Sequence, residues 1–278
     1  MAIVDWHHKT ALVTGAGTGI GRALSRELSR RGAFVYVSAL TIAEAQAVVD
    51  EIAAERGRAV ALVLDVTDNT AYAAAIQRVV KEQTAIDLLV NNAGILFVGE
   101  YFDMDERYLE QLIRINHTAV AIGTLYGYRA MKQQGHGLIA NVASMGGVVP
   151  VGTMAAYSAS KHAVVGLTAA VGGEAEAYGV DLKVICPGNI ASDMLANAKT
   201  RGTNAQGVLD VLPGPMPTDQ AARVIVDGLG TRKRRIFVPR YAHLLSVLQR
   251  LWPGFGHRGA VHSSRQFRSL RDDSLDQH

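Results

Sequence analysis

The chain has 278 residues, of which 49% are hydrophobic and 19% are charged, and its formal net charge at pH 7 is +3. These values are typical of a soluble globular protein that buries one large core. The single cysteine, Cys186, excludes an internal disulfide bond, and its apolar neighbours indicate a packed strand residue in a protein of a reducing compartment.

The N-terminal segment MAIVDWHHKTALVTG has no apolar region of signal-peptide length, and no uncharged apolar stretch is long enough to cross a bilayer. We therefore expect a cytoplasmic protein. The charge is unevenly distributed, because residues 231–271 hold ten Lys or Arg and no acidic residue. The basic character thus belongs to the C-terminal part of the chain.

Short aliphatic and β-branched runs alternate with longer helix-like windows along the chain. Windows such as GRALSRELSRRG have apolar residues three and four positions apart, which is typical of helices. The alternation predicts an α/β fold, a Rossmann-type doubly wound parallel sheet in a single domain with a C-terminal helical extension. The expected strands are 11–15, 34–40, 59–66, 87–94, 137–144, 180–188 and 235–239.

The glycine-rich segment TGAGTGIG, residues 14–21, directly follows the first expected strand. Glycine lets the backbone approach a ligand closely, and the free N–H groups of the helix that follows attract phosphate. A lone glycine pattern is weak evidence and is often only a flexible turn. The strand before it and the helix after it favour a pyrophosphate cradle.

Several further motifs stand at the ends of later strands. Together with the spacing of the glycine-rich segment, they resemble the short-chain dehydrogenase/reductase family over roughly residues 8–240. The motifs are NNAG at 91–94, LDVT with Asp65, Ser144 after its strand, YSASK with Tyr157 and Lys161, and PG at 187–188 before NIASDM.

Four residues of the pattern are expected to be catalytic. Tyr157 and Lys161 lie four positions apart, so on a helix they share a face, although ordinary amphipathic helices contain the same pair. The resemblance implies that the tyrosine hydroxyl exchanges a proton with the substrate oxygen while hydride moves between substrate and nicotinamide. It also implies that Lys161 favours the phenolate, that Ser144 orients the substrate oxygen, and that Asn116 holds a water that relays protons.

The resemblance implies NAD or NADP as the cofactor and no metal. Its expected contacts are Gly15, Thr18, Gly19, Ile20, Gly21, Ser38, Asp65, Val66, Asn91, Asn92, Ala93, Gly94, Tyr157, Lys161, Pro187, Gly188, Ile190 and Ser192.

The end of the second strand bears on the choice between the two nicotinamides. Ala39 stands where NAD-dependent relatives have an acid, and Leu40 and Thr18 stand where NADP-dependent relatives have basic residues. Hydroxyl groups at Ser38 and Thr41 and the charge of Arg22 offer partners for a 2′-phosphate. We therefore expect NADP rather than NAD.

The segments expected around the substrate carry almost no charge. One of them is the segment 190–217, which we expect to be a mobile substrate loop. The residues expected around the substrate are Leu96, Phe97, Val98, Met145, Val148, Val149, Met154, Met194 and Leu195. This favours an apolar alcohol or carbonyl of steroid, retinoid, terpenoid or fatty-acyl type. The alternatives are a 3-oxoacyl-thioester reductase of lipid synthesis and a non-catalytic nucleotide-binding scaffold.

Residues 1–240 are expected to form the cofactor-binding domain and residues 241–278 a basic extension. Residues 244–252 contain an apolar stripe with Arg250 beside it, which fits peripheral membrane contact, a cap on the substrate cavity or a second subunit. The family resemblance implies a homodimer or homotetramer, although Gly172 and Gly173 in the expected contact helix can change that contact. No recognition motif accompanies the basic charge, so we expect no nucleic-acid partner.

Overall fold

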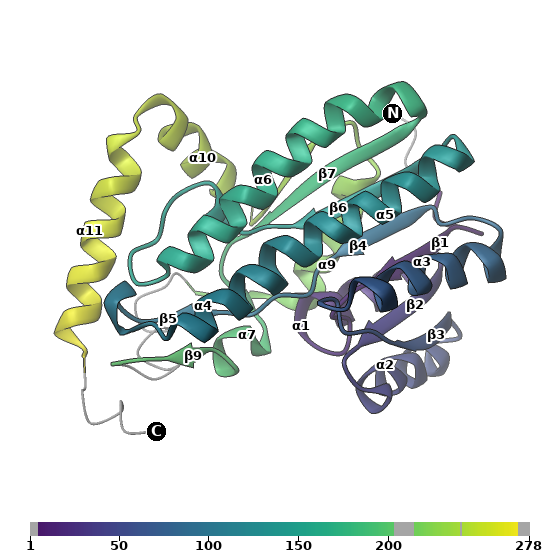
Figure 1. The fold of residues 1–278 in the computed structure, drawn as a ribbon, viewed down its shortest axis with the longest axis horizontal. Helices are drawn as coiled ribbons and strands as arrows, with labels where there is room; N and C mark the ends of the chain where they lie inside the picture. Colours follow the sequence, from purple (N-terminus) through teal and green to yellow (C-terminus); the bar gives the residue numbers. More distant parts are fainter. Residues whose placement is uncertain (1–4, 203–213, 240, 272–278) are drawn as a thin grey trace.

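The computed structural model describes residues 5–202, 214–239 and 241–271. Seven parallel strands form one central sheet in the order β11-β7-β6-β4-β1-β2-β3 (Figure 1). All seven expected strands form, and the prediction of a single doubly wound domain is confirmed. The strands are β1 (Thr10–Val13), β2 (Phe34–Ala39), β3 (Arg58–Val63), β4 (Leu88–Asn91), β6 (Gly137–Val142), β7 (Val180–Pro187) and β11 (Arg235–Val238).

The central strands β1, β4 and β6 are mostly apolar and mostly buried because helices cover both faces of the sheet. In β1, Leu12 packs with the cluster that contains Tyr72, whereas Val13 packs on the opposite face with the cluster that contains Leu24. Both strand residues are fully buried. A parallel sheet covered in this way has continuous hydrophobic strands rather than alternating ones.

Three helices cover each face of the sheet (Figure 1). One face carries α1 (Gly19–Arg30), α2 (Ile42–Ala54) and α9 (Thr218–Leu229). The other carries α3 (Asn69–Gln83), α5 (Ala119–Gln134) and α6 (Ala155–Ala175), and α4 (Glu106–Ile113) leads through the π-helical turn η2 (Arg114–Thr118) into α5. The side chains of Thr41, Asp68 and Asp105 cap the first turns of α2, α3 and α4.

Short elements lie beyond the carboxyl ends of the strands. Strand β9 pairs with β5 and β10 pairs with β8, so part of the expected substrate loop 190–217 has regular structure; residues 203–213 of that loop lie outside the described residues. The short elements are β5 (Phe97–Val98), η1 (Tyr101–Asp103), η3 (Met145–Gly147), η4 (Glu176–Tyr178), β8 (Ile190–Ala191), α7 (Asp193–Ala196), β9 (Lys199–Thr200) and β10 (Met216–Pro217).

The expected C-terminal extension forms two helices, α10 (Tyr241–Leu251) and α11 (Gly254–Ser269), at the substrate end of the sheet (Figure 1). Helix α11 is held by a hydrogen bond of 3.1 Å from the Gly152 N–H to the Ser263 hydroxyl and by ion pairs of Arg268 and Arg271 with Glu100. The extension is therefore packed on the domain. Within the described residues, no helix combines the length and the apolar character needed to span a membrane.

Candidate active site

A cavity of about 550 Å³ opens at the carboxyl ends of the central strands, where doubly wound folds bind ligands. Its wall combines the glycine-rich turn after β1, the NNAG segment after β4, Ser144 after β6, and Pro187 and Gly188 at the end of β7. The expected motifs, which are far apart in the sequence, thus meet at one site. Of the expected cofactor residues, the lining includes Gly15, Thr18, Gly19, Ile20, Asp65, Val66, Asn92, Ala93, Gly94, Tyr157, Lys161, Pro187, Gly188, Ile190 and Ser192.

The glycine-rich turn has the form of an anion cradle. Gly15 and Gly19 have φ angles of +59° and +53°, which residues with a Cβ rarely adopt, and a Cβ on Gly15 would lie 2.8 Å from the Cα of Ala93. Helix α1 begins at Gly19 without a side-chain cap on Thr18 and without an acid in its first turn. The N–H groups of its first turn are therefore left for a ligand such as a pyrophosphate.

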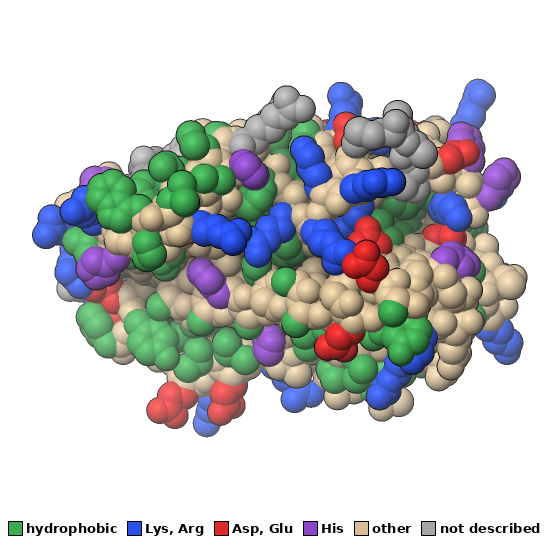
Figure 2. Space-filling model, turned by 90° about the horizontal axis from the view of Figure 1, so that it is seen from above, with side chains coloured by type: hydrophobic (Ala, Val, Ile, Leu, Met, Phe, Trp, Pro, Cys, Tyr) green, Lys and Arg blue, Asp and Glu red, His purple; other side chains and the backbone are tan. Residues whose placement is uncertain are grey.

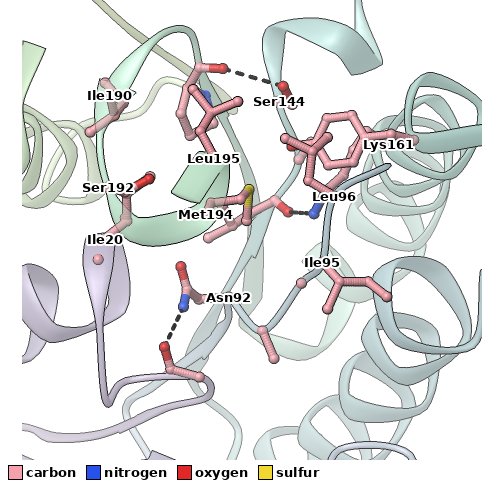
Figure 3. Close-up of a pocket in the computed structure, with 18 of the residues that line it drawn as sticks. Ile20, Asn92, Ile95, Leu96, Ser144, Lys161, Ile190, Ser192, Met194 and Leu195 are labelled. Atoms are coloured by element: carbon pink, nitrogen blue, oxygen red, sulfur yellow. Dashed lines mark hydrogen bonds between the residues drawn. The ribbon is translucent and has the colours of Figure 1, made fainter. Parts of the chain in front are cut away.

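Thr14 and Asn92 join the glycine-rich turn to the NNAG segment. The Asn92 amide donates hydrogen bonds to the carbonyl groups of Thr14 and Gly15, at 2.9 and 3.0 Å, and the Thr14 hydroxyl accepts from the Asn92 N–H at 2.9 Å. Figure 3 shows Asn92 in this position below the cavity. Thr14 was not among the expected site residues, although it is the first letter of the glycine-rich motif.

Three expected cofactor contacts do not line the cavity. The Ser38 hydroxyl is fully buried and donates to the Val13 carbonyl at 3.2 Å, so it is directed into the sheet. The buried Asn91 amide bonds to Asn141 and Tyr72 within the core. A Cβ on Gly21 would run into the carbonyl of Gly15 and the Asn92 amide, so Gly21 allows the turn to close.

Tyr157 and Lys161 lie on one face of α6, as expected from their spacing, and both line the cavity. Both side chains are buried, and the Lys161 ammonium lies 5.7 Å from the centre of the Tyr157 ring. Lys161 Nζ also donates to the Val142 carbonyl at 2.9 Å, which is drawn in Figure 3. The end of β6 therefore fixes the position of the cation beside the phenol.

Burial dominates the proton affinities of this pair. It raises the pKa of the Tyr157 phenol, while a hydrogen bond with Ser144 acts in the opposite direction with a smaller effect. Burial also lowers the pKa of Lys161 to about 8. Burial thus favours the neutral form of both groups, and the Lys161 ammonium beside the ring is the cation available to stabilise a phenolate.

Ser144 and Asn116 occupy different layers of the site. Ser144 lines the cavity, and its hydroxyl accepts from the Gly146 N–H at 3.0 Å. Asn116 is fully buried in the π-helical turn, where its amide donates to and accepts from the backbone of Ile95 at 2.8 Å each. A Cβ on Gly94 would lie 3.1 Å from Asn116 Oδ1 and 3.5 Å from Lys161 Nζ. The structure thus brings Asn116 to the Lys161 end of the site but not into the cavity wall.

Apolar side chains line the part of the cavity beyond Ser144 and Tyr157. In Figure 3, Met194 and Leu195 reach from α7 into the space between Ser144 and Asn92. Leu96, Met145 and Met154 also line it as expected, whereas Phe97, Val98, Val148 and Val149 do not. The lining residues that sequence reasoning missed include Ile95, Val151, Asn197, Tyr241 and Leu245.

The end of the cavity that follows β2 is acidic. Glu44 and Asp65 line it, and Lys161 is the only Lys or Arg among the described lining residues. The Arg22 guanidinium, expected to face a phosphate, instead forms two hydrogen bonds with Glu51, at 2.9 and 2.7 Å. Glu44 was missed because the motif Thr41-x-x-Glu44 signals a capping box, which indeed forms.

No group of three or more His, Cys, Asp or Glu side chains suited to a metal ion occurs in the described part of the chain.

The model of the short chain dehydrogenase family matches residues 9–202. The chain belongs to the short-chain dehydrogenase/reductase family. It is therefore an oxidoreductase that depends on a nicotinamide cofactor, NAD or NADP.

Three curated proteins illustrate the range of this family around the chain. The chain is 34% identical over 213 residues, 75% of this chain and 83% of the relative, to the uncharacterized oxidoreductase YxjF of Bacillus subtilis (strain 168). It is 36% identical to a cyclohexanol dehydrogenase of Acinetobacter sp. (strain SE19) over 194 residues, which are 69% of this chain and 76% of the relative. It is 34% identical to the 3-oxoacyl-[acyl-carrier-protein] reductase FabG of Escherichia coli (strain K12) over 191 residues, which are 69% of this chain and 77% of the relative.

Two solved structures share the fold of this short-chain dehydrogenase. A short chain dehydrogenase/reductase from Burkholderia phymatum in complex with NAD aligns with a TM-score of 0.81 at 22% identity, over 90% of this chain and 96% of that one. A metagenomic short-chain oxidoreductase in complex with NADP aligns with a TM-score of 0.67 at 28% identity, over 84% of this chain and 97% of that one. The first likeness concerns the fold alone.

Proposed function

We propose that this short-chain dehydrogenase interconverts an apolar alcohol and its ketone or aldehyde, of steroid, retinoid, terpenoid or fatty-acyl type. The observation that carries the proposal is the lining beyond Tyr157, where Leu96, Met154 and Leu195 surround the space in front of the phenol. Apolar walls with a few convergent polar groups favour apolar ligands that carry one reactive oxygen. Methionine side chains adapt to ligands of different shape.

The proposed chemistry uses Tyr157, Lys161 and Ser144 in separate roles. In carbonyl reduction, the Tyr157 hydroxyl donates its proton to the substrate oxygen, and in alcohol oxidation its phenolate takes the proton back. The nearby Lys161 ammonium stabilises that phenolate, and the Ser144 hydroxyl orients the substrate oxygen. The nicotinamide, when bound, supplies or accepts the hydride. Asn116 holds the Ile95 backbone at the Lys161 end, a position that supports its proposed part in proton relay.

The residues around the glycine-rich turn fit a dinucleotide. The uncapped start of α1 suits the pyrophosphate, and Ile190 and Ser192 line the side of the cavity proposed for the nicotinamide. Glu44 and Asp65 would repel a 2′-phosphate but can accept hydrogen bonds from a ribose hydroxyl. We therefore propose NAD as the preferred cofactor, which reverses the preference for NADP derived from the missing acid at Ala39.

The test is turnover of the purified chain with NAD and a panel of alcohols: cyclohexanol, a hydroxysteroid, a retinol and a long-chain fatty alcohol, against the sugar alcohol sorbitol. We expect oxidation of at least one apolar alcohol and a kcat/KM for sorbitol lower by a factor of about 10² or more, because the apolar wall leaves its hydroxyl groups unpaired. Equal rates with sorbitol would contradict the substrate class.

The alternative within the same chemistry is a 3-oxoacyl-thioester reductase, for which the likeness to FabG is weak support. A kcat/KM that is highest with acyl-carrier thioesters would favour this alternative. The remaining alternative, a non-catalytic nucleotide-binding scaffold, predicts no turnover with any of these substrates.

A homodimer or homotetramer, a cytoplasmic location and peripheral membrane contact are further parts of this proposal. Family membership supports the first of them.

A further inference from the structure

The outer surface of α10 carries an apolar stripe that faces solvent. Leu244, Leu248 and Leu251 follow one another at spacings of four and three residues, which places them on one face of the helix. Leu244 and Leu251 are 60% and 78% exposed, and the adjoining Trp252 is 57% exposed. In a globular domain such a stripe normally faces the core, and an exposed apolar patch marks an interaction site.

The same helix also forms part of the cavity wall. Ala242 is buried against the domain, while Tyr241 and Leu245 line the cavity that contains Tyr157. Helix α10 thus has one apolar side that contacts the cavity and another that contacts solvent. A partner that binds the outer side of α10 is therefore separated from the cavity only by this helix.

Cations surround the outer stripe. Arg250 and Arg258 are exposed, and the Arg258 guanidinium lies 5.2 Å from the centre of the Trp252 ring. Exposed histidines at positions 243 and 257 lie in the same two helices, and residues 231–271 contain no acid. Figure 2 shows the molecule from above, and toward its left, where α10 meets α11 in Figure 1, hydrophobic side chains lie beside Lys, Arg and His side chains.

We infer that this surface docks on an anionic phospholipid bilayer. We call it the α10 face, and it consists of Leu244, Val247, Leu248, Arg250, Leu251, Trp252 and Arg258. An apolar face with cations at its border lies in the interface of such a bilayer, with the apolar side chains among the acyl chains and the cations at the headgroups.

Charge complementarity favours an anionic bilayer over a second copy of the chain as the partner of this face. A twofold contact through the α10 face would bring the same arginines of both copies together, without acids from residues 231–271 to neutralise them. Anionic headgroups neutralise them directly. The inference rests on the proposed function in one respect: docking would place the cavity wall at Tyr241 and Leu245 next to a lipid phase that holds apolar substrates.

The test is binding of the full chain to vesicles, without substrate or cofactor. Co-sedimentation compares vesicles of phosphatidylcholine and phosphatidylglycerol with vesicles of phosphatidylcholine alone. Tryptophan emission gives a second readout, because Trp252 is exposed whereas the only other tryptophan, Trp6, is buried. We expect binding to the anionic vesicles and a blue shift of the emission, and weaker binding to phosphatidylcholine alone.

Leu251→Glu tests the face itself, since this side chain is exposed and its replacement leaves the fold intact. It is expected to weaken binding to anionic vesicles by about tenfold, because a carboxylate replaces an inserted apolar group. The matched control is Val63→Glu, which adds the same charge at an exposed position of β3, at the opposite edge of the sheet from β11. The control is expected to bind within about twofold of the wild type.

Three results would overturn the inference: no binding to anionic vesicles, equal loss in both variants, or self-association in vesicle-free solution that Leu251→Glu abolishes. The last would assign the face to a contact between copies of the chain. Vesicle binding by a chain that oxidises no alcohol would support the docking surface and contradict the proposed function, so the two failures are distinguishable.

Discussion

The carboxylates of Glu44 and Asp65 determine the electrostatics at the cofactor end of the cavity. Glu44 lines the cavity from the first turn of α2, where its carboxylate also accepts a hydrogen bond of 3.3 Å from the Thr41 N–H. A 2′-phosphate placed there would meet two negative charges, because Arg22 is neutralised by Glu51. At the residue scale, the proposed preference for NAD therefore depends on a helix side chain rather than on the strand end at Ala39.

Glu44→Gln is expected to raise the affinity for NADPH by about tenfold, equivalent to about 1.4 kcal/mol, and to leave NADH binding within about threefold. Glutamine removes the charge but can still complete the capping box with Thr41. Fluorescence titration with NADH and NADPH measures both values.

The control for this prediction is Asp50→Asn, which removes an exposed negative charge from the same helix at a position outside the cavity lining. An equal gain in NADPH affinity with both variants would show that net charge, and not the position of Glu44, is responsible.

For two strand residues expected at the site, the sequence did not indicate the direction of the side chain. Ser38 lies between two buried residues and Asn91 ends a strand of buried residues, so no polar alternation indicates which way each side chain points. The parallel register directs Ser38 to the Val13 carbonyl and Asn91 to Asn141. Tyr157 and Lys161 were predictable as a pair because helical spacing alone places them on one face.

At the scale of elements, the start of a helix can be predicted from sequence where a capping side chain directly precedes the helix. Thr41, Asp68 and Asp105 each accept backbone N–H groups of the helix that they precede. Helix α1 lacks such a cap, and its free N–H groups lie at the cavity. The position of α11 depends on contacts with segments more than 100 residues away, such as Glu100 and Gly152, and no local pattern encodes such contacts.

Helix α11 packs through Phe267 on an apolar cluster beside the cavity. This ring is buried in the cluster that contains Leu96, Tyr157 and Leu195. Phe267→Ala is expected to lower the free energy of unfolding by about 3 kcal/mol, because a large aromatic side chain is removed from a packed site. It is also expected to raise KM for the apolar alcohol more than it changes kcat, since the proton-exchanging groups remain in place.

Phe102→Ala is the matched control, because Phe102 is 75% exposed near the same end of the molecule. Chemical denaturation and steady-state kinetics of both variants test the role of α11. Similar effects of the two substitutions on stability and KM would contradict it.

At the scale of the whole molecule, alternating apolar runs and helical windows were sufficient for the doubly wound fold. The central strands, such as β1 and β4, coincide with runs of buried, mostly aliphatic residues, whereas the edge strands β3 and β11 are partly exposed. Sequence order places the carboxyl ends of the parallel strands at one edge. The same logic located the cavity. The C-terminal helices complete its wall with Tyr241 and Leu245, which only the assembled fold brings there.

The central claim is that Tyr157 exchanges the proton in a site that also binds the nicotinamide. Its most direct test compares Tyr157→Phe with the wild type, by titration with NADH and by single-turnover oxidation of the best alcohol of the panel. Tyr108→Phe is the control, because its hydroxyl donates to the Leu96 carbonyl at 3.0 Å outside the cavity lining.

We predict that Tyr157→Phe binds NADH within about twofold of the wild type and slows hydride transfer by a factor of about 10²–10⁴, whereas Tyr108→Phe keeps most of the rate. An unchanged rate in Tyr157→Phe would contradict the role of the phenol, and failure of the wild type to bind NADH would contradict the cradle.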